Sequence, residues 1–536
     1  HLACDATNTL AVSTLRKRKC REEKPLAVMI RDLETAKSIC FLSEAEEKLL
    51  SSVERPIVLL AKRESMPVVE DVAPGNKYLG VMLPYTPLHH LLLENAPPLV
   101  MTSGNLTDEP LAYKDEDALV RLGTIADYFL VHDREIFTRC DDSVARVVGQ
   151  KTQMIRRSRG YVPNVVKLPF GSRQVLAVGA ELKNTFCLLK DDLAFPGHHI
   201  GDLKNLEAYE AFSTGIEHLK KLLHAEPEII AHDMHPDYLS TRYALESELP
   251  LLAVQHHHAH IASCMAENGI DEKVIGLSFD GTGYGSDGTV WGGEFLVADF
   301  QEFERVAHFA PVGLPGGEAA INEPWRMAVS YLGAAFGDRL LDEDVPLFRR
   351  VGPEKVRAIL RMIERQVNTP VTSSCGRLFD AVSSLTGVRD FVSFEGQAAM
   401  ELEMCASELY SGHPYSYRIF KQEDCHLLDV ADMIREILED LRRGTAVGEV
   451  SRRFHETLGA GVTEMCGIIR DEKALGTVCM SGGVFQNALL SGILMKSLAA
   501  AGFRVYVHSL VPANDGGLAL GQAAVACHRS SLSRSG

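Results

Sequence analysis

The stretch VIGLSFDGTGYGSDGTVWGGEFLVADF, residues 274–300, carries the pattern that decides the fold. An apolar run ends at Asp280, a glycine-rich turn follows at Gly281, Gly283 and Gly285, and a second apolar run comes after it. Glycines at such a turn let backbone N–H groups approach a phosphate closely, and an aspartate at a strand end is well placed for a metal or its water shell. Taken alone, the same pattern also describes a β-hairpin with a bulge.

Two more glycine turns lie further along the chain. VCMSGGVFQN, residues 478–487, predicts a strand, then Gly482 and Gly483, then a helix whose N-terminus could support a phosphate. VPANDGG, residues 511–517, places Asp515 in a turn before another helix, where a capped helix start is the alternative. Three glycine-rich turns with acidic strand ends together favour the architecture of the actin-like ATPases.

A histidine cluster precedes the first glycine turn, in VQHHHAHIAS, residues 254–263. His256 and His260 are four residues apart, so a helix puts both imidazoles on one face and permits joint metal coordination. Capping or core hydrogen bonds are the alternative. A zinc metalloprotease is a poor fit, because the glutamate of the H-E-x-x-H motif is absent.

The N-terminal part offers a different chemistry. LRKRKCREEK, residues 15–24, holds six Lys or Arg side chains in ten positions, which could neutralise a triphosphate. In VMTSGNLTDEP, residues 100–110, Thr102, Ser103 and Asn105 could bind phosphate oxygens from a loop. A solvated helix face and a capped turn are the alternatives for these two segments.

Length and patterning indicate at least two α/β domains in these 536 residues. Strand-like runs alternate with helical stretches in the first part, and residues 165–174 read as the joint. We therefore expect one domain at 1–171 and a second at 172–536, in which α/β layers alternate.

The charge and the cysteine content exclude several classes of protein. With 55 basic and 72 acidic side chains the net charge is -17, which argues against broad affinity for nucleic acid or anionic membranes. Twelve cysteines without a C-x-x-C pair indicate neither a zinc ribbon nor a disulfide framework. Without an apolar run of about 18 residues or a signal-peptide pattern, we expect a cytoplasmic protein.

The first domain resembles the YrdC-type domain in the form found within the HypF family of carbamoyltransferases. The resemblance is carried by K-x-R-x-x-K-P-L at Lys19 to Leu26, followed by RPIVLL, LPYTPLHHLLL, MTSGN and DDSVAR. It implies an ATP site with phosphates held by Lys19, Arg21 and Lys24, a nucleotide pocket lined by Thr102, Ser103 and Asn105, and closure by Ser143, Arg146 and Arg157. Glu22 departs from the usual proline, and we expect it to point outward.

The second domain is similar to the TsaD-type domain of the same family over essentially all of 172–536. HHHAHIAS, SFDGTGYG, GRLFDAV, EGQAAMELE, SGGVFQN and NDGG occur in the family's order, whereas GHHIGDL at 197–203 departs slightly from the family spelling. The resemblance implies a two-lobed actin-like (ASKHA) α/β fold. The implied metal ligands are His256, His260 and Asp515 with Asp280 nearby, the catalytic candidates are His256, His260 and Asp280, and the nucleotide lies against Gly281, Gly283, Gly482 and Gly483.

The family resemblance implies a relay between two sites. ATP and carbamate, derived from carbamoyl phosphate, would give carbamoyl adenylate in the first domain. The second domain would transfer the carbamoyl group to the C-terminal cysteine of HypE, for the cyanide ligands of nickel-iron hydrogenase. The implied cofactors are ATP, Mg²⁺ and one bound metal, zinc or iron. The family's N-terminal acylphosphatase and zinc-finger parts are not visible here, so we expect weak or no use of carbamoyl phosphate by this chain alone.

Three alternatives remain open. An O-carbamoyltransferase acting on a small-molecule hydroxyl combines the same modules in reversed order. Threonylcarbamoyl transfer to tRNA normally divides the modules between proteins, and the acidic charge offers no obvious RNA surface. A nucleotide-sensing scaffold would bind ATP and a partner without chemistry, and the absence of adenylate exchange would reveal it.

Overall fold

The computed structural model describes residues 1–106, 109–171, 173–408 and 412–532, and the chain divides into two compact units. The first unit contains residues 1–253 and 508–536, and the second contains residues 254–507. The chain thus leaves the first unit, builds the second and returns. This division into compact units does not test the domain boundary expected between residues 171 and 172, so that boundary stays a prediction.

The N-terminal part of the first unit is built on an eight-stranded sheet with the order β1-β6-β2-β5-β4-β7-β8, to which β3 adds through β4. Parallel and antiparallel pairs both occur in it. Its strands are β1 (Leu2–Asp5), β2 (Ala27–Met29), β3 (Cys40–Phe41), β4 (Ile57–Lys62), β5 (Tyr78–Met82), β6 (Leu99–Thr102), β7 (Val144–Val148) and β8 (Lys151–Arg156).

Short helices accompany this sheet, and the apolar side chains of strands and helices form its core. The helices are α1 (Thr9–Lys19), α2 (Leu33–Ile39), α3 (Glu44–Leu50), η1 (Glu70–Val72), α4 (Pro87–Leu93) and α5 (Asp115–Arg121). The N-terminus of α3 is fixed by a capping box, in which Ser43 and Glu46 each bond the other's backbone N–H.

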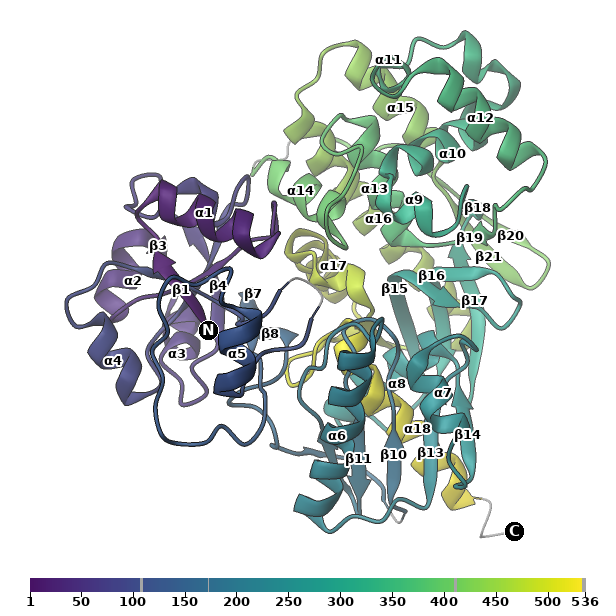
Figure 1. Ribbon diagram of the computed structural model, residues 1–536. Coiled ribbons are helices and arrows are strands. Elements are labelled where there is room, and N and C mark those ends of the chain that lie inside the picture. The colour runs from purple at the N-terminus through teal and green to yellow at the C-terminus, as the bar shows by residue number, and fades with distance from the viewer. Residues whose placement is uncertain (107–108, 172, 409–411, 533–536) are drawn as a thin grey trace. The chain divides into compact units, whose positions relative to one another are not determined.

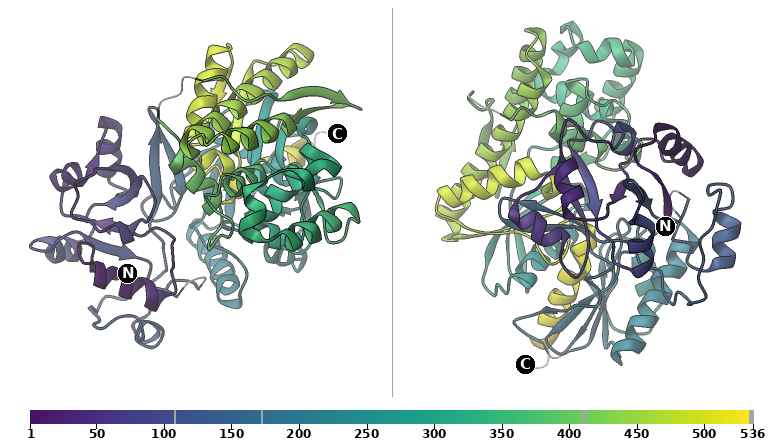
Figure 2. Two further views of the ribbon diagram at one scale, coloured as in Figure 1. Left: turned by 90° about the horizontal axis from the view of Figure 1, so that it is seen from above. Right: turned by 90° about the vertical axis from the view of Figure 1, so that its left-hand side faces the viewer.

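A second sheet of the first unit has six strands in the order β14-β13-β10-β11-β12-β9. The strands are β9 (Val166–Lys167), β10 (Val175–Ala177), β11 (Cys187–Lys190), β12 (Leu193–Pro196), β13 (Ile229–Asp233) and β14 (Leu251–Val254), and the helices are α6 (Leu206–Leu223), α7 (Leu239–Leu245), η4 (Asp515–Gly517) and α18 (Leu518–Leu532). Helix α6 buries Phe212, Ile216 and Leu219, whose spacing of three to four residues defines one apolar face. Helix α18, at the yellow end of the chain, lies along β10, β11 and β13 (Figures 1 and 2).

The second unit is built on a nine-stranded sheet with the order β20-β21-β17-β16-β15-β22-β23, in which β19 pairs with β16 and with β18. The strands are β15 (Val274–Tyr284), β16 (Val290–Ala298), β17 (Phe303–Phe309), β18 (Val312–Gly313), β19 (Val371–Thr372), β20 (Arg418–Gln422), β21 (Cys425–Asp429), β22 (Thr477–Ser481) and β23 (Arg504–Tyr506).

Helices pack on this sheet and on one another. They are α8 (His256–Glu267), α9 (Glu318–Asn322), α10 (Pro324–Phe336), η2 (Gly337–Asp342), α11 (Pro346–Val351), α12 (Pro353–Glu364), α13 (Cys375–Leu385), α14 (Gln397–Cys405), α15 (Ala431–Arg442), α16 (Val447–Lys473), η3 (Gly483–Gln486) and α17 (Ala488–Ala500). In the part of the chain that the structure describes, no helix combines the length and the apolar character that crossing a bilayer requires.

Candidate functional site

Two arginines of the basic segment at the end of α1 bond neighbouring parts of the chain. Arg16 donates to the carbonyls of Asp71, Arg21 and Lys24, among others, and so fixes the loop that follows the helix. Arg18 donates to the Ile125 carbonyl and pairs with Asp127. These two arginines therefore hold the framework. The residues expected to bind phosphate are Lys19, Arg21 and Lys24.

Lys19 ends α1 and is buried. Its ammonium donates to the Ser103 carbonyl at 2.8 Å and to Asn105 Oδ1 at 2.8 Å. Thr102 ends β6 just ahead of this loop, and Ser103 Oγ also donates to Asn105 Oδ1. The structure thus brings Lys19 together with the loop that the sequence proposed as a nucleotide pocket.

The cations around this loop repel one another. Burial, together with the charge of Arg21, lowers the pKa of Lys19 to about 7. Desolvation by the surrounding chain, with the charges of Arg21 and Arg156, lowers the pKa of Lys24 to about 8, although this side chain keeps an exposed surface. Burial and Arg156 lower that of Arg21 to about 10. We call Lys19, Arg21, Lys24 and Arg156 the cationic recess. Such a cluster is stabilised by an anion, because an anion restores the charged forms.

Two features of the recess bear on the sequence reasoning. Arg156 was not among the predicted residues. It is the last residue of β8, whereas the predicted Arg157 follows the strand and donates to backbone carbonyls, so the basic pair at the strand end was the available signal. Glu22 is exposed, as expected. Lys183 of the following segment also acts on the recess, because its charge helps to lower the pKa of Lys24. Burial and the charges of Arg156, Lys183 and Lys24 hold the pKa of His199 well below its usual value.

The three residues expected to close the pocket have framework partners. Ser143 Oγ donates to the Arg159 carbonyl and accepts the Ser158 N–H. Arg146 Nε donates to Gln153, and Arg157 donates to the carbonyls of Pro196, Tyr161 and Asn164. Their proposed contact with nucleotide stays a prediction.

In the second unit, the histidine cluster lies at the start of α8. The helix is buried on all sides, so its imidazoles are held in the core. His256 and His260 are on one face, with ring centroids 4.9 Å apart. The other two histidines point elsewhere: His258 bonds the Asp299 carbonyl and His257 packs near Trp291.

The glycine turn after Asp280 is a bulge inside a long hairpin, which was the alternative interpretation. Strand β15 continues to Tyr284, and its register with β16 shifts between Phe279 and Gly283. The bulge aims Asp280 at α8, with Asp280 Oδ2 3.0 Å from His260 Nε2. A Cβ on Gly283 would lie 2.4 Å from His257 Cε1, so only glycine allows this approach.

Asp280 is held ionised against the effect of burial. Burial would raise its pKa, but His260 and His256, with the Gly281 N–H, keep that pKa below its usual range. Gly483 approaches the same carboxylate, since a Cβ there would lie 2.9 Å from Asp280 Oδ1. Strands β15 and β22 are parallel neighbours, so their carboxyl ends bring both glycine turns together.

The helix after Gly482 and Gly483 is not open to a phosphate in the expected way. The short η3 begins at Gly483 and separates the glycine turn from α17, and Asn487 caps α17 by accepting the Leu490 N–H. Glu403 accepts the N–H groups of the next residues, Ala488 and Leu489. A nucleotide would therefore rest on the glycine turns and not on this helix N-terminus.

The N-terminus of α13 packs against the bulge. Ser374 caps this helix and donates to the carbonyls of Asp280 and Gly281. A Cβ on Gly376 would lie 2.8 Å from the Gly281 Cα, so this packing requires glycine. The motif GRLFDAV thus supports the bulge directly, which its sequence alone did not indicate.

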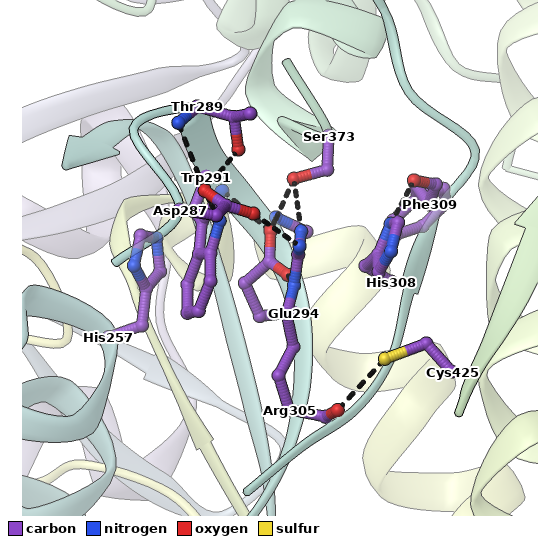
Figure 3. A network of polar contacts seen from close by, with 12 residues as sticks. His257, Asp287, Thr289, Trp291, Glu294, Arg305, His308, Phe309, Ser373 and Cys425 are labelled. Carbon is purple, nitrogen blue, oxygen red and sulfur yellow. Dashed lines mark hydrogen bonds and ion pairs between the residues drawn. The ribbon is translucent and has the colours of Figure 1, made fainter. Parts of the chain in front are cut away.

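The tip of the β15–β16 hairpin is locked by a polar network (Figure 3). Asp287 accepts from Trp291 Nε1 and from Thr289, and pairs with Arg305. The Arg305 guanidinium lies 4.2 Å from the Trp291 ring centroid and bonds the buried Glu294 at 2.6 Å. Since Trp291 also packs against His257, the network braces the histidine helix from the hairpin side.

The donor set fits a transition metal. His256, His260 and Asp280 offer two imidazole nitrogens and a carboxylate oxygen within 4.8 Å of one another. Such ligands suit zinc or iron. Asp515 begins η4 in the first unit, where Asn514 caps the turn by accepting the Gly516 N–H. Its role as a further ligand stays a prediction.

Three family models match the chain in succession. The model described as "Telomere recombination", for Sua5, YciO and YrdC proteins, matches residues 1–158. "HypF Kae1-like domain" matches 171–267, and "Carbamoyltransferase, Kae1-like Domain, second subdomain" matches 276–522.

Relatives and solved structures agree with these models. Carbamoyltransferase HypF2 of Cupriavidus necator is 42% identical, covering 99% of this chain and 70% of that protein. Probable carbamoyltransferase HypF of Methanocaldococcus jannaschii is 33% identical, covering 97% of this chain and 68% of that protein. The crystal structure of full-length HypF in its phosphate- and nucleotide-bound form has a TM-score of 0.95 at 46% identity, covering 98% of this chain and 83% of that one.

The matches define a class of enzyme, the carbamoyltransferases built from a YrdC-like and a Kae1-like part. Within that class, the chain belongs to the HypF family. The expected fold class, a YrdC-like α/β domain followed by an actin-like α/β domain, is confirmed.

Proposed function

We propose that the chain forms carbamoyl adenylate from ATP and carbamate in the cationic recess, and transfers the carbamoyl group to a protein thiol at the His256, His260 and Asp280 site. The observation that carries the proposal is the presence, in one chain, of a cationic recess suited to polyphosphate and a separate histidine–aspartate cluster suited to a metal. An ATP-using acyl activation followed by a transfer needs both kinds of site.

In the first step a carbamate oxygen attacks the α-phosphorus of ATP. A new P–O bond forms as the bond to the pyrophosphate oxygen breaks, and pyrophosphate leaves. A bound Mg²⁺ would supply further neutralisation of the phosphate charge. Lys19, Arg21 and Lys24 would neutralise the charge that develops on the departing phosphates. Lys19 contributes its charge beside the Ser103–Asn105 loop, whose oxygens accept the hydrogen bonds of its ammonium.

In the second step a thiolate sulfur attacks the carbamoyl carbon, and the bond from that carbon to the AMP oxygen breaks. Backbone groups around Gly281, Gly283, Gly482 and Gly483 would hold the AMP phosphate, since glycine allows close approach there. His256, His260, Asp280 and, by the family resemblance, Asp515 would hold a zinc or iron ion, whose chemistry is to polarise the carbamoyl oxygen.

The proposed acceptor is the C-terminal cysteine of HypE, and the proposed process is maturation of nickel-iron hydrogenase in the cytoplasm. Membership of the HypF family supports the choice of partner and process. Transfer to a tRNA or a small hydroxyl compound is less well supported, because the relatives with high coverage are named HypF.

ATP–pyrophosphate exchange with labelled pyrophosphate and freshly dissolved carbamate tests the relay. We expect exchange to fall by about 100-fold or more in Lys19→Ala and to survive in His256→Ala, whereas carbamoyl transfer to HypE should be lost in both. Lys17→Ala is the matched control, since Lys17 lies two residues earlier on the same helix and is exposed.

Two outcomes would contradict the proposal. Exchange that survives in Lys19→Ala would move the adenylation site elsewhere. Absence of exchange in the wild-type chain, with ATP still bound, would favour a nucleotide-sensing scaffold.

A further inference from the structure

Two adjacent carboxylates precede β7, and their surroundings differ. Asp142 is saturated: Arg159 Nε donates to it at 2.7 Å and His1 Nε2 lies 2.8 Å away. The carboxylate of Asp141 receives no hydrogen bond from any described residue, and its ion-pair partner, Arg156 Nη1, is 3.9 Å away. The backbone at Asp141 is nevertheless fixed, because its carbonyl accepts the Arg159 N–H at 3.0 Å.

Asp141 faces the cationic recess. Burial raises its pKa, and the charges of Arg156 and Lys19 oppose that effect, so both cations act on this carboxylate. Its side chain keeps 22% of its surface exposed, and a bound molecule can therefore reach it. Asp142 points instead to Arg159, whose guanidinium stacks on Tyr85.

A carboxylate in this position opposes phosphate binding, because it repels the anion that the recess attracts. A ligand group that this carboxylate recognises must be a hydrogen-bond donor, because an ionised carboxylate only accepts. Of the two substrates of the proposed adenylation, ATP brings the phosphates. Carbamate brings an anionic end suited to the cations and an amino group suited to an acceptor.

We propose that Asp141 is the specificity-determining residue that accepts a hydrogen bond from the amino group of carbamate in the recess. The assignment rests on the proposed adenylation and adds the basis of its substrate choice. It separates carbamate from carboxylates of the same shape that lack a donor, such as acetate, in which a methyl group replaces the amino group. A site built around such a hydrogen bond discriminates strongly against an analogue without the donor.

The test compares ATP–pyrophosphate exchange with carbamate and with acetate in the wild-type chain and in Asp141→Asn and Asp141→Ala. We expect the wild type to prefer carbamate in kcat/KM, and we expect each variant to lose about 10- to 100-fold of that preference. The KM for ATP should stay the same or fall, because a negative charge leaves the recess. Asp133→Asn, an exposed aspartate of the preceding loop, is the matched control.

Several outcomes would overturn the assignment. An unchanged preference for carbamate, or an equal loss of kcat/KM with both substrates, would show that Asp141 is a counter-ion of the recess. A higher requirement for Mg²⁺ with unchanged preference would make it a cation ligand. If acetate supports no exchange, the KM for carbamate is compared with that for ATP, and a rise in both would reject specificity. No exchange by the wild type with either substrate would reject the adenylation itself, a result distinct from these.

Discussion

The cationic recess and the histidine–aspartate cluster represent two ways of building a polar site. In the recess, long side chains come from a helix end, a loop and a strand end, and burial together with neighbouring cations lowers the pKa values of Lys19, Arg21 and Lys24. In the cluster, His256, His260 and Asp280 are held by a buried helix and a bulged strand, where glycines set the approach. Charge attraction tolerates loose placement, whereas metal ligands need fixed directions.

The largest effect is expected from a substitution that removes a metal ligand from the cluster and leaves the recess unchanged. His260→Ala should lower metal affinity by at least about 100-fold, because loss of a metal ligand weakens binding more than loss of a residue that only orients a ligand. Metal content after dialysis, and carbamoyl transfer to HypE, should both fall, while ATP–pyrophosphate exchange persists. His258→Gln, on the same helix but bonded to the Asp299 carbonyl, should keep the metal. Full metal content in His260→Ala would remove His260 from the ligand set.

A smaller effect is expected from crowding the bulge. The Cβ in Gly283→Ala would lie 2.4 Å from His257 Cε1 and 3.0 Å from His256 Cδ2. Overpacking of this kind costs about 1–3 kcal/mol of unfolding free energy, which urea titration measures. Gly467→Ala in α16, where no atom lies within 4 Å of the added Cβ, should be neutral or stabilising. Equal stability of the two variants would show that α8 adapts freely.

The brace in Figure 3 allows a finer test of rigidity. Trp291→Ala removes the ring between Arg305 and His257, and should weaken metal binding by about 10-fold. Trp291→Phe keeps a ring and loses only the bond from Nε1 to Asp287, so metal binding should be largely restored. The absorption spectrum of the cobalt-substituted protein reports ligand geometry. Identical spectra in wild type and Trp291→Ala would contradict a positioning role.

The smallest effect concerns pH and distinguishes the recess from the cluster. Lys19 and Lys24 have pKa values lowered to about 7 and about 8, so they lose protons as pH rises through that window. Bound phosphate favours the protonated lysines, and ATP binding therefore takes up protons and weakens as pH rises. Calorimetry should show the Kd for ATP rising several-fold from about pH 6.5 to about pH 9. Lys24→Ala should flatten this profile, and an unchanged slope would exclude Lys24.

The sequence was a good guide to the segments that form the sites. It was a poorer guide to the side chains within those segments that face a ligand. Composition marks residues 15–24 as basic, but only the helix geometry of α1 decides that Arg16 turns to the Asp71 carbonyl and Lys19 to the Ser103 loop. In the same way, tertiary contacts alone separate Arg156, at the end of β8, from Arg157, which donates to the Pro196 carbonyl. Such choices depend on tertiary contacts that a local pattern does not contain.

The glycine motifs show a second limit. The spacing of Gly281, Gly283 and Gly285 is compatible with a turn and with a bulge, and the pairing with β16 decides for the bulge. The free N-terminus expected after Gly483 is closed by Glu403, a residue 80 positions earlier in the chain. The pair of histidines was predictable, since a spacing of four residues on a helix leaves one geometry.

The order of the two units along the chain has a consequence for biosynthesis. Residues 254–507 form the second unit, and the first unit is completed only by residues after 507. Helix α18 covers β10, β11 and β13, so a growing polypeptide leaves those strands uncovered until the ribosome has made residues 518–532. During translation the second unit can fold first, and a premature stop codon near residue 507 would leave it folded beside an incomplete first unit.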